Sequence, residues 1–540
     1  MVAQLGFSGG LVTNTNQSTA WARMLVRDAS TSIDAVYYNP AGLTKLGDGF
    51  HLSLNNQALF QTQTINSTYP YLNNGEYSGD VSATVFPGVY AAWKKGRVAV
   101  SFGFNPIGGG GGARFNRGLP GMEIPVSSLL PALTPAFQQM GYGALTGYDV
   151  DLFFSGTSVY FGFQGGLSYA INEHISLYAG ARFVMAKNTY NGHMKDIKLH
   201  TESGATLPAS QTMNGISAQM EGLSQQTQAG GDAMAPIIDG GGGDYTFAQL
   251  EGAGMISPEQ RAQMEGGLLA MGIPQTSVDA MSAAQAQATY YGASAEFYDR
   301  SLTFTSLGFV LQDQQADVTQ TGSAVTPIVG ANFNLLNDKL NIGLKYEFHT
   351  KMDLTNSVDN KKGFIVDYDP VKKEGDYMFV DGDTQNADIP AMLSVGVSYK
   401  IAKPLSIQVG YHTYFDSKAG WATNDDGESI IDKNFSEYAI GLEYNVTENF
   451  LLSAGYLKAI TGVNDLYQND MRYSLTTNTF GGGAAFMITE KLTLQLGGFF
   501  TSYDEQTFDK AYDLSGVDIP YEETYDKETF SVSVGIDIKI

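Results

Sequence analysis

The feature that most constrains the fold is a hairpin unit that recurs along most of the chain. In each unit, two segments of alternating apolar and polar residues are joined by a short polar turn. Six such turns lie at 94–96, 171–174, 337–339, 402–404, 447–449 and 489–491. Across 492–497, for example, leucines alternate with Thr493, Gln495 and Gly497. A period of two predicts β-strands with one apolar face and one mixed or polar face.

Reading outward from these turns predicts an all-β chain of fourteen antiparallel strands. We expect them at 50–63, 81–93, 97–105, 157–170, 174–190, 322–335, 340–356, 390–401, 404–416, 435–445, 449–459, 472–488, 491–504 and 529–540. The connections between hairpins are all longer, at 64–80, 106–156, 191–321, 357–389, 417–434, 460–471 and 505–528. Short turns at one end and long loops at the other are typical of an outer-membrane β-barrel, whose short turns are periplasmic. A soluble β-sandwich is the alternative, although it rarely sorts its loop lengths by end.

The composition agrees with a barrel. The chain has 63 Gly, 31 Tyr and 30 Phe but only 3 Trp, which suits many strands, tight turns and aromatic girdles. No run of about 18 apolar residues occurs, so a spanning helix is excluded, and no signal peptide begins at Met1. We therefore expect the numbering to be that of a processed or recombinant mature chain. A barrel needs no apolar run, because its strands alternate lipid-facing and lumen-facing residues.

The charge and the reactive residues argue against nucleic-acid binding and catalysis. A formal net charge of −24 repels nucleic acid, and the absence of Cys excludes disulfides and thiolate metal sites. No Ser-His-Asp order, metal-ligand spacing or credible carboxylate pair is found. We predict no enzymatic activity, no metal and no cofactor, with a barrel lipase or protease as the enzymatic alternative.

The last segment, 530–540, predicts a closing barrel strand. Its apolar residues at even positions alternate with small or polar residues at odd positions. Many outer-membrane proteins end on an aromatic residue that assists assembly, and Ile540 departs from that habit.

The beginning of the chain, unlike the rest, does not alternate. A lumen enclosed by fourteen strands is too wide for side chains alone to fill. We therefore predict an N-terminal plug at 1–48 that folds inside a barrel at 49–540 and stops leakage.

The end of this plug carries the most specific motif of the chain. The segment 34–43 reads DAVYYNPAGL, with an Asn-Pro-Ala core at Asn39, Pro40 and Ala41 just before the first predicted strand. This core and its position resemble the signature of the FadL family of outer-membrane long-chain fatty-acid and hydrocarbon transporters. The resemblance continues through 102–106, the Gly-Leu-Ser-Tyr hairpin at 166–190 and Ile-Pro-Ala at 389–391, so that it spans the full chain.

The resemblance implies passive uptake of small hydrophobic molecules, with long-chain fatty acids first among them. Ligand would lodge among apolar residues of the long third and fourth external loops and then pass to a pocket closed by the plug. The plug would shift, and ligand would leave sideways into the membrane where the third strand kinks inward. Gly103 and Pro106 are the candidate kink, because Gly weakens a strand and Pro cannot donate to the ladder. The alternative is a strand that simply ends at 105–106.

The same resemblance implies the surroundings of the protein. We expect a multi-pass barrel in the bacterial outer membrane, in contact with its lipid and lipopolysaccharide, with both termini periplasmic and able to work as a monomer. Acidic residues in the loops at 425–432 and 513–526 either bridge to lipopolysaccharide through divalent cations or form solvated faces. Two other functions remain open, a scaffold or shuttle in protein secretion and a receptor for haem, for which His193 and His200 are the candidate residues.

The loop at 106–156 supplies most of the candidate ligand-binding residues. It begins with glycines at 108–112 and continues with apolar residues at partly helical spacing. These are Met122, Ile124, Leu129, Leu130, Leu133, Phe137 and Met140. An apolar face outside a cell either binds or packs, so a ligand groove and packing against the neighbouring loop are both open. In the plug, Phe7, Leu11 and Val12 are expected to contact the ligand.

The loop at 191–321 is far longer than a barrel needs, and such loops are usually functional. Seven methionines between Met213 and Met281 suit either ligands of varied shape or the core of a small helical cap. Ser257 followed by Pro258 predicts a helix start. The glycine run at 239–244 predicts a flexible linker, because it matches neither a phosphate loop nor a calcium loop.

Overall fold

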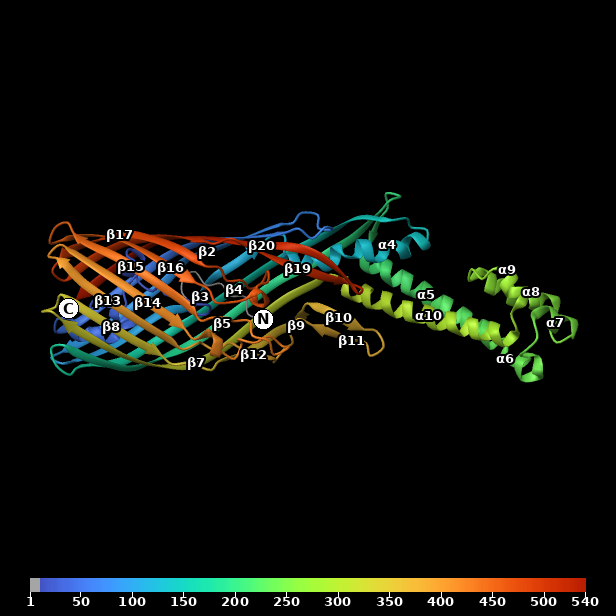
Figure 1. The fold of residues 1–540 in the computed structure, drawn as a ribbon, viewed down its shortest axis with the longest axis horizontal. Helices are drawn as coiled ribbons and strands as arrows, with labels where there is room; N and C mark the ends of the chain where they lie inside the picture. The colour runs from blue at the N-terminus through green and yellow to red at the C-terminus, as the bar shows by residue number, and fades with distance from the viewer. Residues whose placement is uncertain (1–9) are drawn as a thin grey trace.

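The main body of the protein is a closed β-barrel with a long helical projection at one end (Figure 1). The computed structural model describes residues 10–540, including all side chains but those of 110 and 360–362. The barrel closes where β1 (Gly49–Ser67) pairs with β20 (Val517–Lys539) along nearly its whole length. The predicted barrel of fourteen antiparallel strands is confirmed.

The wall strands follow one another around the barrel in chain order, each antiparallel to the next. Between β1 and β20 they are β2 (Glu76–Lys95), β3 (Val98–Phe115), β4 (Leu145–Ala170), β5 (Ile175–Thr201), β7 (Gln314–Leu335), β8 (Leu340–Glu347), β13 (Met392–Ala402), β14 (Leu405–Tyr414), β15 (Phe435–Asn445), β16 (Phe450–Ile460), β17 (Thr477–Thr489) and β18 (Leu492–Tyr503). Ile540 lies at the end that carries the short turns (Figure 1).

Several strands reach further at the long-loop end than the sequence predicts. β3 continues to Phe115 and β4 begins at Leu145, so the connection predicted at 106–156 is shorter. β5 runs to Thr201 and β7 begins at Gln314, which shortens the connection predicted at 191–321. A run of glycines interrupts the apolar alternation in the extension of β3, and charged residues interrupt it in β4, β5 and β7, so a period of two does not mark these extensions.

The strand predicted at 340–356 is two strands. β8 ends at Glu347, and β9 (Asp353–Gly363) follows after a break. The Phe348 N–H donates to the carbonyl of Pro327 on β7, at 3.0 Å. Proline has no N–H to donate in return, so the ladder stops at this position.

Exposed and buried side chains alternate along the wall strands, but the apolar side chains are the exposed ones, opposite to the arrangement in a soluble protein. On β20, Phe530, Val532 and Val534 are 50%, 46% and 44% exposed, whereas Ser531 and Ser533 are buried at 0% and 7%. Apolar residues therefore cover the outside, and polar residues line the lumen. This pattern fits a barrel wall surrounded by lipid, and 530–540 is the closing strand that the sequence predicts.

Shorter helices and strands lie inside the lumen and at the long-loop end of the barrel. The remaining strands are β6 (Thr206–Pro208), β10 (Ile365–Asp369), β11 (Glu374–Tyr377), β12 (Thr384–Asn386) and β19 (Gln506–Leu514). Inside the barrel lie α1 (Thr19–Ala22), α2 (Ala35–Tyr38) and the 3₁₀ helix η1 (Pro40–Lys45). The connection from β3 to β4 holds α3 (Pro120–Ser127) and α4 (Leu129–Gln139), and η3 (Asp416–Lys418) and η4 (Asp465–Tyr467) lie in later loops.

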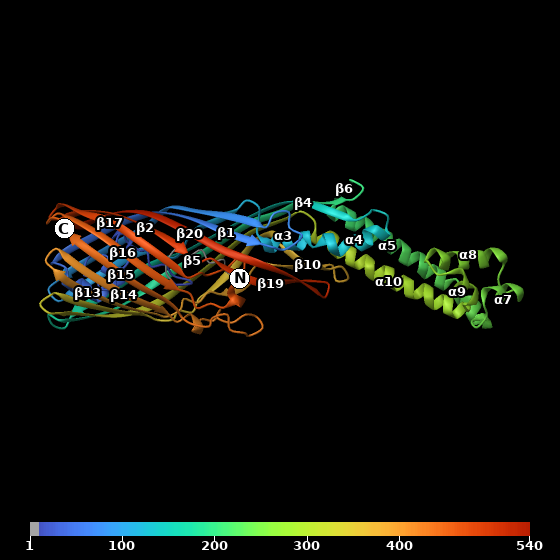
Figure 2. The ribbon, with the colours of Figure 1, turned by 45° about the horizontal axis from the view of Figure 1, so that its top comes forward.

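The projection is an antiparallel pair of long helices, α5 (Ala209–Asp232) and α10 (Ala283–Val310) (Figures 1 and 2). At 1.5 Å per residue, α10 is about 40 Å long. Small residues let the two helices approach closely, and the hydroxyls of Ser224 and Ser294 each donate to the carbonyl of the other. These two long helices are present in addition to the small helices that we expect in the long outer loops. No helix in the described part of the chain is both long and apolar enough to cross a bilayer.

The tip of the projection is a cap with its own apolar core. The cap consists of α6 (Ala235–Ile237), the π-helical turn η2 (Ile238–Gly242), α7 (Phe247–Gly252), α8 (Pro258–Ala270) and α9 (Gln275–Ala280). The predicted helix start is confirmed, since the side chain of Ser257 caps α8 together with that of Gln260. Met234, Met264, Met271 and Met281 pack in this core. The Met residues of the cap therefore serve packing, the second of the two interpretations.

The glycine run is part of the cap and not a linker, so that prediction is wrong. Gly241 adopts a φ of +85°, which favours glycine, at the kink of η2. Gly242 is buried, and a Cβ there would lie 2.7 Å from the side chain of Leu250.

Candidate functional site

The segment 10–48 lies inside the barrel and bonds to the wall around much of its circumference. We call it the plug. Within it, the Ser18 hydroxyl accepts a hydrogen bond from the Trp21 N–H at 3.0 Å and caps α1. Pro40 occupies the start of η1, where its missing N–H is not needed. The Asn39 side chain donates to the Ser30 carbonyl at 2.9 Å and to Asn332 on β7 at 2.7 Å. The Asn-Pro-Ala core thus fastens the plug both to itself and to the wall.

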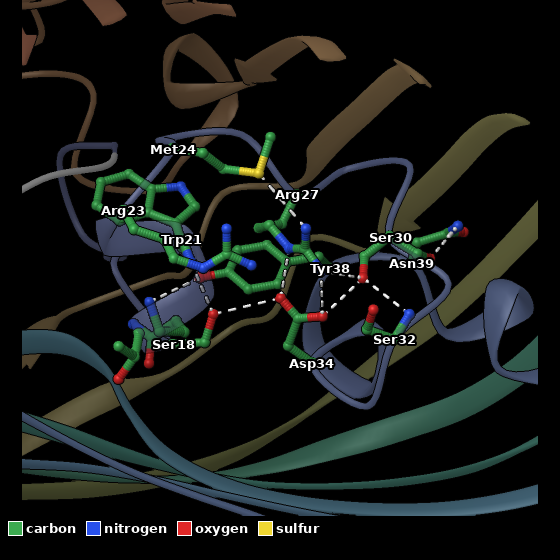
Figure 3. Close-up of polar contacts among 12 residues, drawn as sticks. Ser18, Trp21, Arg23, Met24, Arg27, Ser30, Ser32, Asp34, Tyr38 and Asn39 are labelled. Carbon is green, nitrogen blue, oxygen red and sulfur yellow. Dashed lines mark hydrogen bonds and ion pairs between the residues drawn. The ribbon is translucent and has the colours of Figure 1, made fainter. Parts of the chain in front are cut away.

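A buried ion pair holds the plug in its folded form. The Arg27 guanidinium meets both carboxylate oxygens of Asp34, at 2.7 and 2.9 Å (Figure 3). The Ser30 hydroxyl donates to the same carboxylate at 2.6 Å, and Ser18 approaches it at 3.4 Å. Burial opposes the charged form of Asp34, but the Arg27 guanidinium outweighs burial and holds the pKa of this carboxyl below its ordinary value. Because both side chains are 4% exposed, this pair is part of the plug core and not a surface contact.

Two further groups tie the plug to the wall. Arg23 contacts Glu443 on β15 at 2.6 Å and Gln495 on β18 at 3.1 Å. Asp28 accepts from Ser394 at 2.8 Å and pairs with His412 at 2.5 Å. The charged partners Glu443 and His412 lie on the neighbouring strands β15 and β14, so this segment is fixed to one part of the wall at two points.

Glycines on the wall let the plug backbone lie directly against it. On strands β8 to β20, a Cβ at nine of these glycines would lie 3.0 Å or less from an atom of the plug. We call this set the glycine belt: Gly343, Gly396, Gly410, Gly441, Gly455, Gly481, Gly483, Gly497 and Gly535. A Cβ on Gly455, for example, would overlap the carbonyl group of Met24. The sequence analysis missed this belt, although glycine in a strand interior is a known sign of close backbone approach.

A cluster of two cations and one carboxylate lies beside the plug. Glu347 on β8 pairs with Arg182 at 2.5 Å and with Lys345 at 2.9 Å. Lys345 also donates to the Tyr37 carbonyl at 2.9 Å, and both cations lie over the Tyr37 ring. The Nε of Arg182 is buried and has no hydrogen-bond partner in the described part of the chain. The cluster therefore offers one positive charge more than Glu347 neutralises, and one free donor.

The ladder between β2 and β3 is interrupted at the level of the plug. Regular pairing stops at Val89↔Phe104 and resumes at Val81↔Ala113. On the other side of β3, pairing with β4 continues, with irregularities after Pro106 and Gly109. The alternative that the strand ends at 105–106 is therefore wrong. We call the unpaired stretch the β2–β3 gap.

Plug residues fill this gap with hydrogen bonds that β2 does not make. The Asn14 N–H donates to the Ile107 carbonyl at 2.6 Å, and its side chain donates to the Gly109 carbonyl. The Gln17 side chain donates to the Pro106 carbonyl at 3.0 Å. Gly103 itself pairs regularly with Tyr90 and Gln164, so the irregularity begins at Pro106.

The predicted ligand-binding residues fall into two groups. Leu11 belongs to a buried apolar cluster that continues through Ile107 and Tyr160 to Leu119, with Val12 and Met122 packed against it. Leu129, Leu130, Leu133, Phe137 and Met140 lie on or next to α4 and pack in a second cluster with Met213, Ile216 and Phe304 at the base of the projection. Ile124 is buried at 3% exposure, and Phe7 lies outside the described residues.

The outer loops clamp α3 above the plug. Glu123 accepts hydrogen bonds from the hydroxyls of Tyr77 at 2.8 Å and Tyr148 at 2.6 Å. The Asp470 carboxylate accepts from the Gly121 N–H at 2.7 Å. Burial, together with the nearby Glu523 carboxylate, raises the pKa of Asp470 to about 6. His193 and His200 each lie 3.2 Å from a carboxylate, that of Asp151 and Asp149 respectively.

Comparisons with known proteins find the fold and no close relative in sequence. No protein-family model and no curated protein matches the chain. The crystal structure of a Pseudomonas aeruginosa FadL homologue is similar at a TM-score of 0.53 and 12% identity, over 98% of this chain and 100% of that one. The toluene transporters TodX of P. putida (TM-score 0.46, 11% identity) and TbuX of Ralstonia pickettii (TM-score 0.42, 13% identity) are more distant. Each match covers 94% of this chain and 94% of the transporter. At the level of the fold, the resemblance to FadL seen in the sequence is confirmed.

Proposed function

We propose that this protein carries small hydrophobic molecules passively across the bacterial outer membrane. The observation that supports this most is the buried apolar cluster that contains both Leu119 of the outer loop and Leu11 of the plug. A hydrocarbon exposed to water costs about 0.8 kcal/mol per methylene, so a continuous apolar path lowers the barrier to passage. The fold of the P. aeruginosa FadL homologue agrees with this function.

The exit in this proposal is lateral, through the β2–β3 gap. Plug residues Asn14 and Gln17 now occupy the hydrogen-bonding groups of β3 at this point. If they withdraw, the gap opens from the lumen toward lipid, and ligand leaves without crossing the aqueous end of the barrel. In this arrangement residues 1–48 act as the plug and 49–540 as the barrel. The short turns and both termini face the periplasm, and lipopolysaccharide surrounds the outer loops of a monomer.

The ligand in this proposal is a long-chain fatty acid. Arg182 and Lys345 lie beside the plug, where both pair with the single carboxylate of Glu347, and the Arg182 Nε is free. A carboxylate is the ligand group that such a donor prefers. The predicted contacts of Leu11, Val12 and Met122 with the ligand would then be contacts with its hydrocarbon chain.

A reversible cross-link tests whether the plug must move. The chain has no Cys, so the pair Thr19→Cys and Ser533→Cys, whose hydroxyls are 2.6 Å apart, introduces a unique disulfide two residues from Gln17. We expect oxidation to reduce fatty-acid uptake at least tenfold in cells that lack another transporter, and reduction to restore it. The control pair Thr44→Cys and Ser176→Cys, 2.7 Å apart, fixes η1 instead and should leave uptake unchanged. Full uptake with the first disulfide closed would contradict a moving plug.

A charge substitution tests the ligand class. In Arg182→Gln, Lys345 still neutralises Glu347, so the wall keeps a balanced pair while the extra positive charge is removed. We expect uptake of palmitate to fall about tenfold and uptake of toluene to stay unchanged, because toluene has no carboxylate. Lys187→Gln, on the outward face of the same strand, is the matched control. Equal losses for both ligands would argue against a carboxylate anchor.

The projection favours one alternative function. A long helical pair with a folded cap offers a surface to another protein, as a scaffold or shuttle in secretion requires. Native mass spectrometry of the purified protein separates the two functions. A bound fatty acid supports uptake, whereas a stoichiometric protein partner without lipid supports the scaffold.

A further inference from the structure

The outer loops contain a cavity whose lining differs in chemistry from the apolar path. It has a volume of about 530 Å³ and lies between the connection from β16 to β17 and strand β19. Its lining combines three threonines with Asp465, Gln468, Gln506, Asp509, Val463 and Phe508. Binding sites for small molecules have volumes in this range, but their linings are usually more apolar. The site thus suits a small ligand that is rich in polar groups.

The frame of this cavity is fixed by hydrogen bonds. The Gln468 side chain donates to the Ser474 carbonyl and accepts from the Ser474 N–H, both at 2.9 Å. The Lys510 ammonium donates to the Gln468 carbonyl at 3.2 Å and pairs with Glu523 at 3.0 Å. On the opposite side, the hydroxyls of Thr507 and Thr524 are 2.8 Å apart. A ligand would meet a preformed site and would not have to order these loops.

The groups left for a ligand are acceptors of hydrogen bonds. No hydrogen bond or ion pair within the described residues engages the carboxylates of Asp465 or Asp509. Lys510 is already paired with Glu523, so the two carboxylates of the lining give the cavity negative charge, which repels an anion. The described residues also contain no group of three or more His, Cys, Asp or Glu side chains that could hold a metal ion. These conditions select a ligand with several neutral donors, such as hydroxyl groups.

Phe508 adds an apolar surface to this polar cavity. Its ring packs 5.8 Å from that of Tyr525, which holds it in place. A sugar ring has C–H groups on one face and hydroxyls around its edge, so it matches an aromatic ring bordered by carboxylates and amides. We propose that the cavity between η4 and β19 binds a neutral saccharide, with Asp465 and Asp509 accepting from its hydroxyls and Phe508 contacting its apolar face. This site is separate from the proposed uptake of hydrophobic molecules and does not depend on it.

The test uses the full chain in a detergent without a sugar headgroup. Saturation-transfer NMR measures binding of neutral mono- and disaccharides of hexoses and N-acetylhexosamines, and titration gives their affinities. A second arm uses the neutral outer-core oligosaccharide of lipopolysaccharide, freed of phosphate and acidic sugars, so that a sugar of the cell's own envelope is distinguished from one in solution. We expect the wild type to bind at least one of these probes. Binding should weaken about tenfold in Asp465→Asn and in Asp509→Asn, because each loses a charge-assisted acceptor.

Asp518→Asn, an exposed carboxylate on β20 outside the cavity, is the matched control and should bind as the wild type does. The proposal is overturned if the wild type binds none of the probes, or if the two cavity variants bind as tightly as the control. Tighter binding of spermidine than of any sugar would also overturn it, because the carboxylates would then serve a cation. Preference for the released core over free disaccharides supports the proposal and identifies the envelope as the source.

Discussion

Replacing Gly455 by alanine is expected to release the plug while the barrel stays folded. A Cβ on Gly455 would overlap the carbonyl group of Met24 and lie 3.0 Å from its Cα. These are backbone atoms, so no side-chain rotation relieves the clash, and Arg23 and Asp28 on either side resist a shift of the segment. Overpacking of this kind costs about 1–3 kcal/mol and sometimes more. Here the strain is relieved if the plug leaves its position.

The measurement is leakage of hydrophilic solutes and ions through the barrel. Cells that produce Gly455→Ala should become sensitive to a large hydrophilic antibiotic such as vancomycin, and the purified protein should conduct ions in a planar bilayer far more often than the wild type. Gly482→Ala is the matched control, because this glycine is on the next strand and a Cβ there meets only the Ser453 carbonyl, at 3.6 Å. Equal conductance in the two variants would show that the glycine belt does not hold the plug.

The wall of the barrel was predictable because its signals are local. A period of two marks each strand, and the turn residues at one end mark each hairpin, so the number of strands and the direction of the chain follow from neighbours in sequence. The break after Glu347 was not predictable in the same way. The break occurs because Pro327 of β7 lies opposite Phe348, and only the register of the two strands shows that these residues are opposite each other.

The glycine belt shows a different limit. Gly410, Gly441 and Gly455 lie in strand interiors, where glycine weakens a strand because it has no side chain to pack. The sequence therefore indicates that another backbone approaches closely at these positions. What the sequence does not contain is the position of the plug backbone, since Met24 and Gly455 are brought together by the closed fold alone. The same applies to Asp28, whose partner His412 is hundreds of residues away.

The apolar spacing in the loop at 106–156 predicted a helix but not the element that packs against it. Leu133 and Phe137 do lie on one helix, α4, as their spacing indicates. Their apolar side is covered by Met213 and Phe304 from the helical projection, which a local pattern cannot reveal. Met122 is oriented toward the cluster that includes the plug, so it stays the better candidate for ligand contact.

Replacing Arg27 by methionine is expected to destabilise the plug more than any other single substitution of its core. The variant leaves the buried Asp34 carboxylate with the Ser30 and Ser18 hydroxyls and without a hydrogen-bonded cation. Removing one partner of a buried ion pair costs about 3–5 kcal/mol, whereas replacing both partners by apolar residues is often close to neutral. We therefore expect amide hydrogen exchange in 18–45 to accelerate strongly in Arg27→Met and to return most of the way in Arg27→Met/Asp34→Leu.

The pH dependence of this protection should reverse between the wild type and the variant. In the wild type the pKa of Asp34 is below its ordinary value. The unfolded plug, with a pKa of about 3.9, then takes up a proton first as the pH falls. Protection should therefore be constant from neutral pH down to about 4 and decrease below it.

In Arg27→Met, burial acts on Asp34 without the hydrogen-bonded guanidinium and raises the pKa of this carboxyl, so the folded plug takes up the proton first. Protection, corrected for intrinsic exchange, should then increase as the pH falls from 7 toward 4. The double variant lacks both groups, and subtracting its profile removes the contribution of every other titrating residue. Parallel profiles in the wild type and Arg27→Met after that correction would mean that this ion pair does not control the docking of the plug.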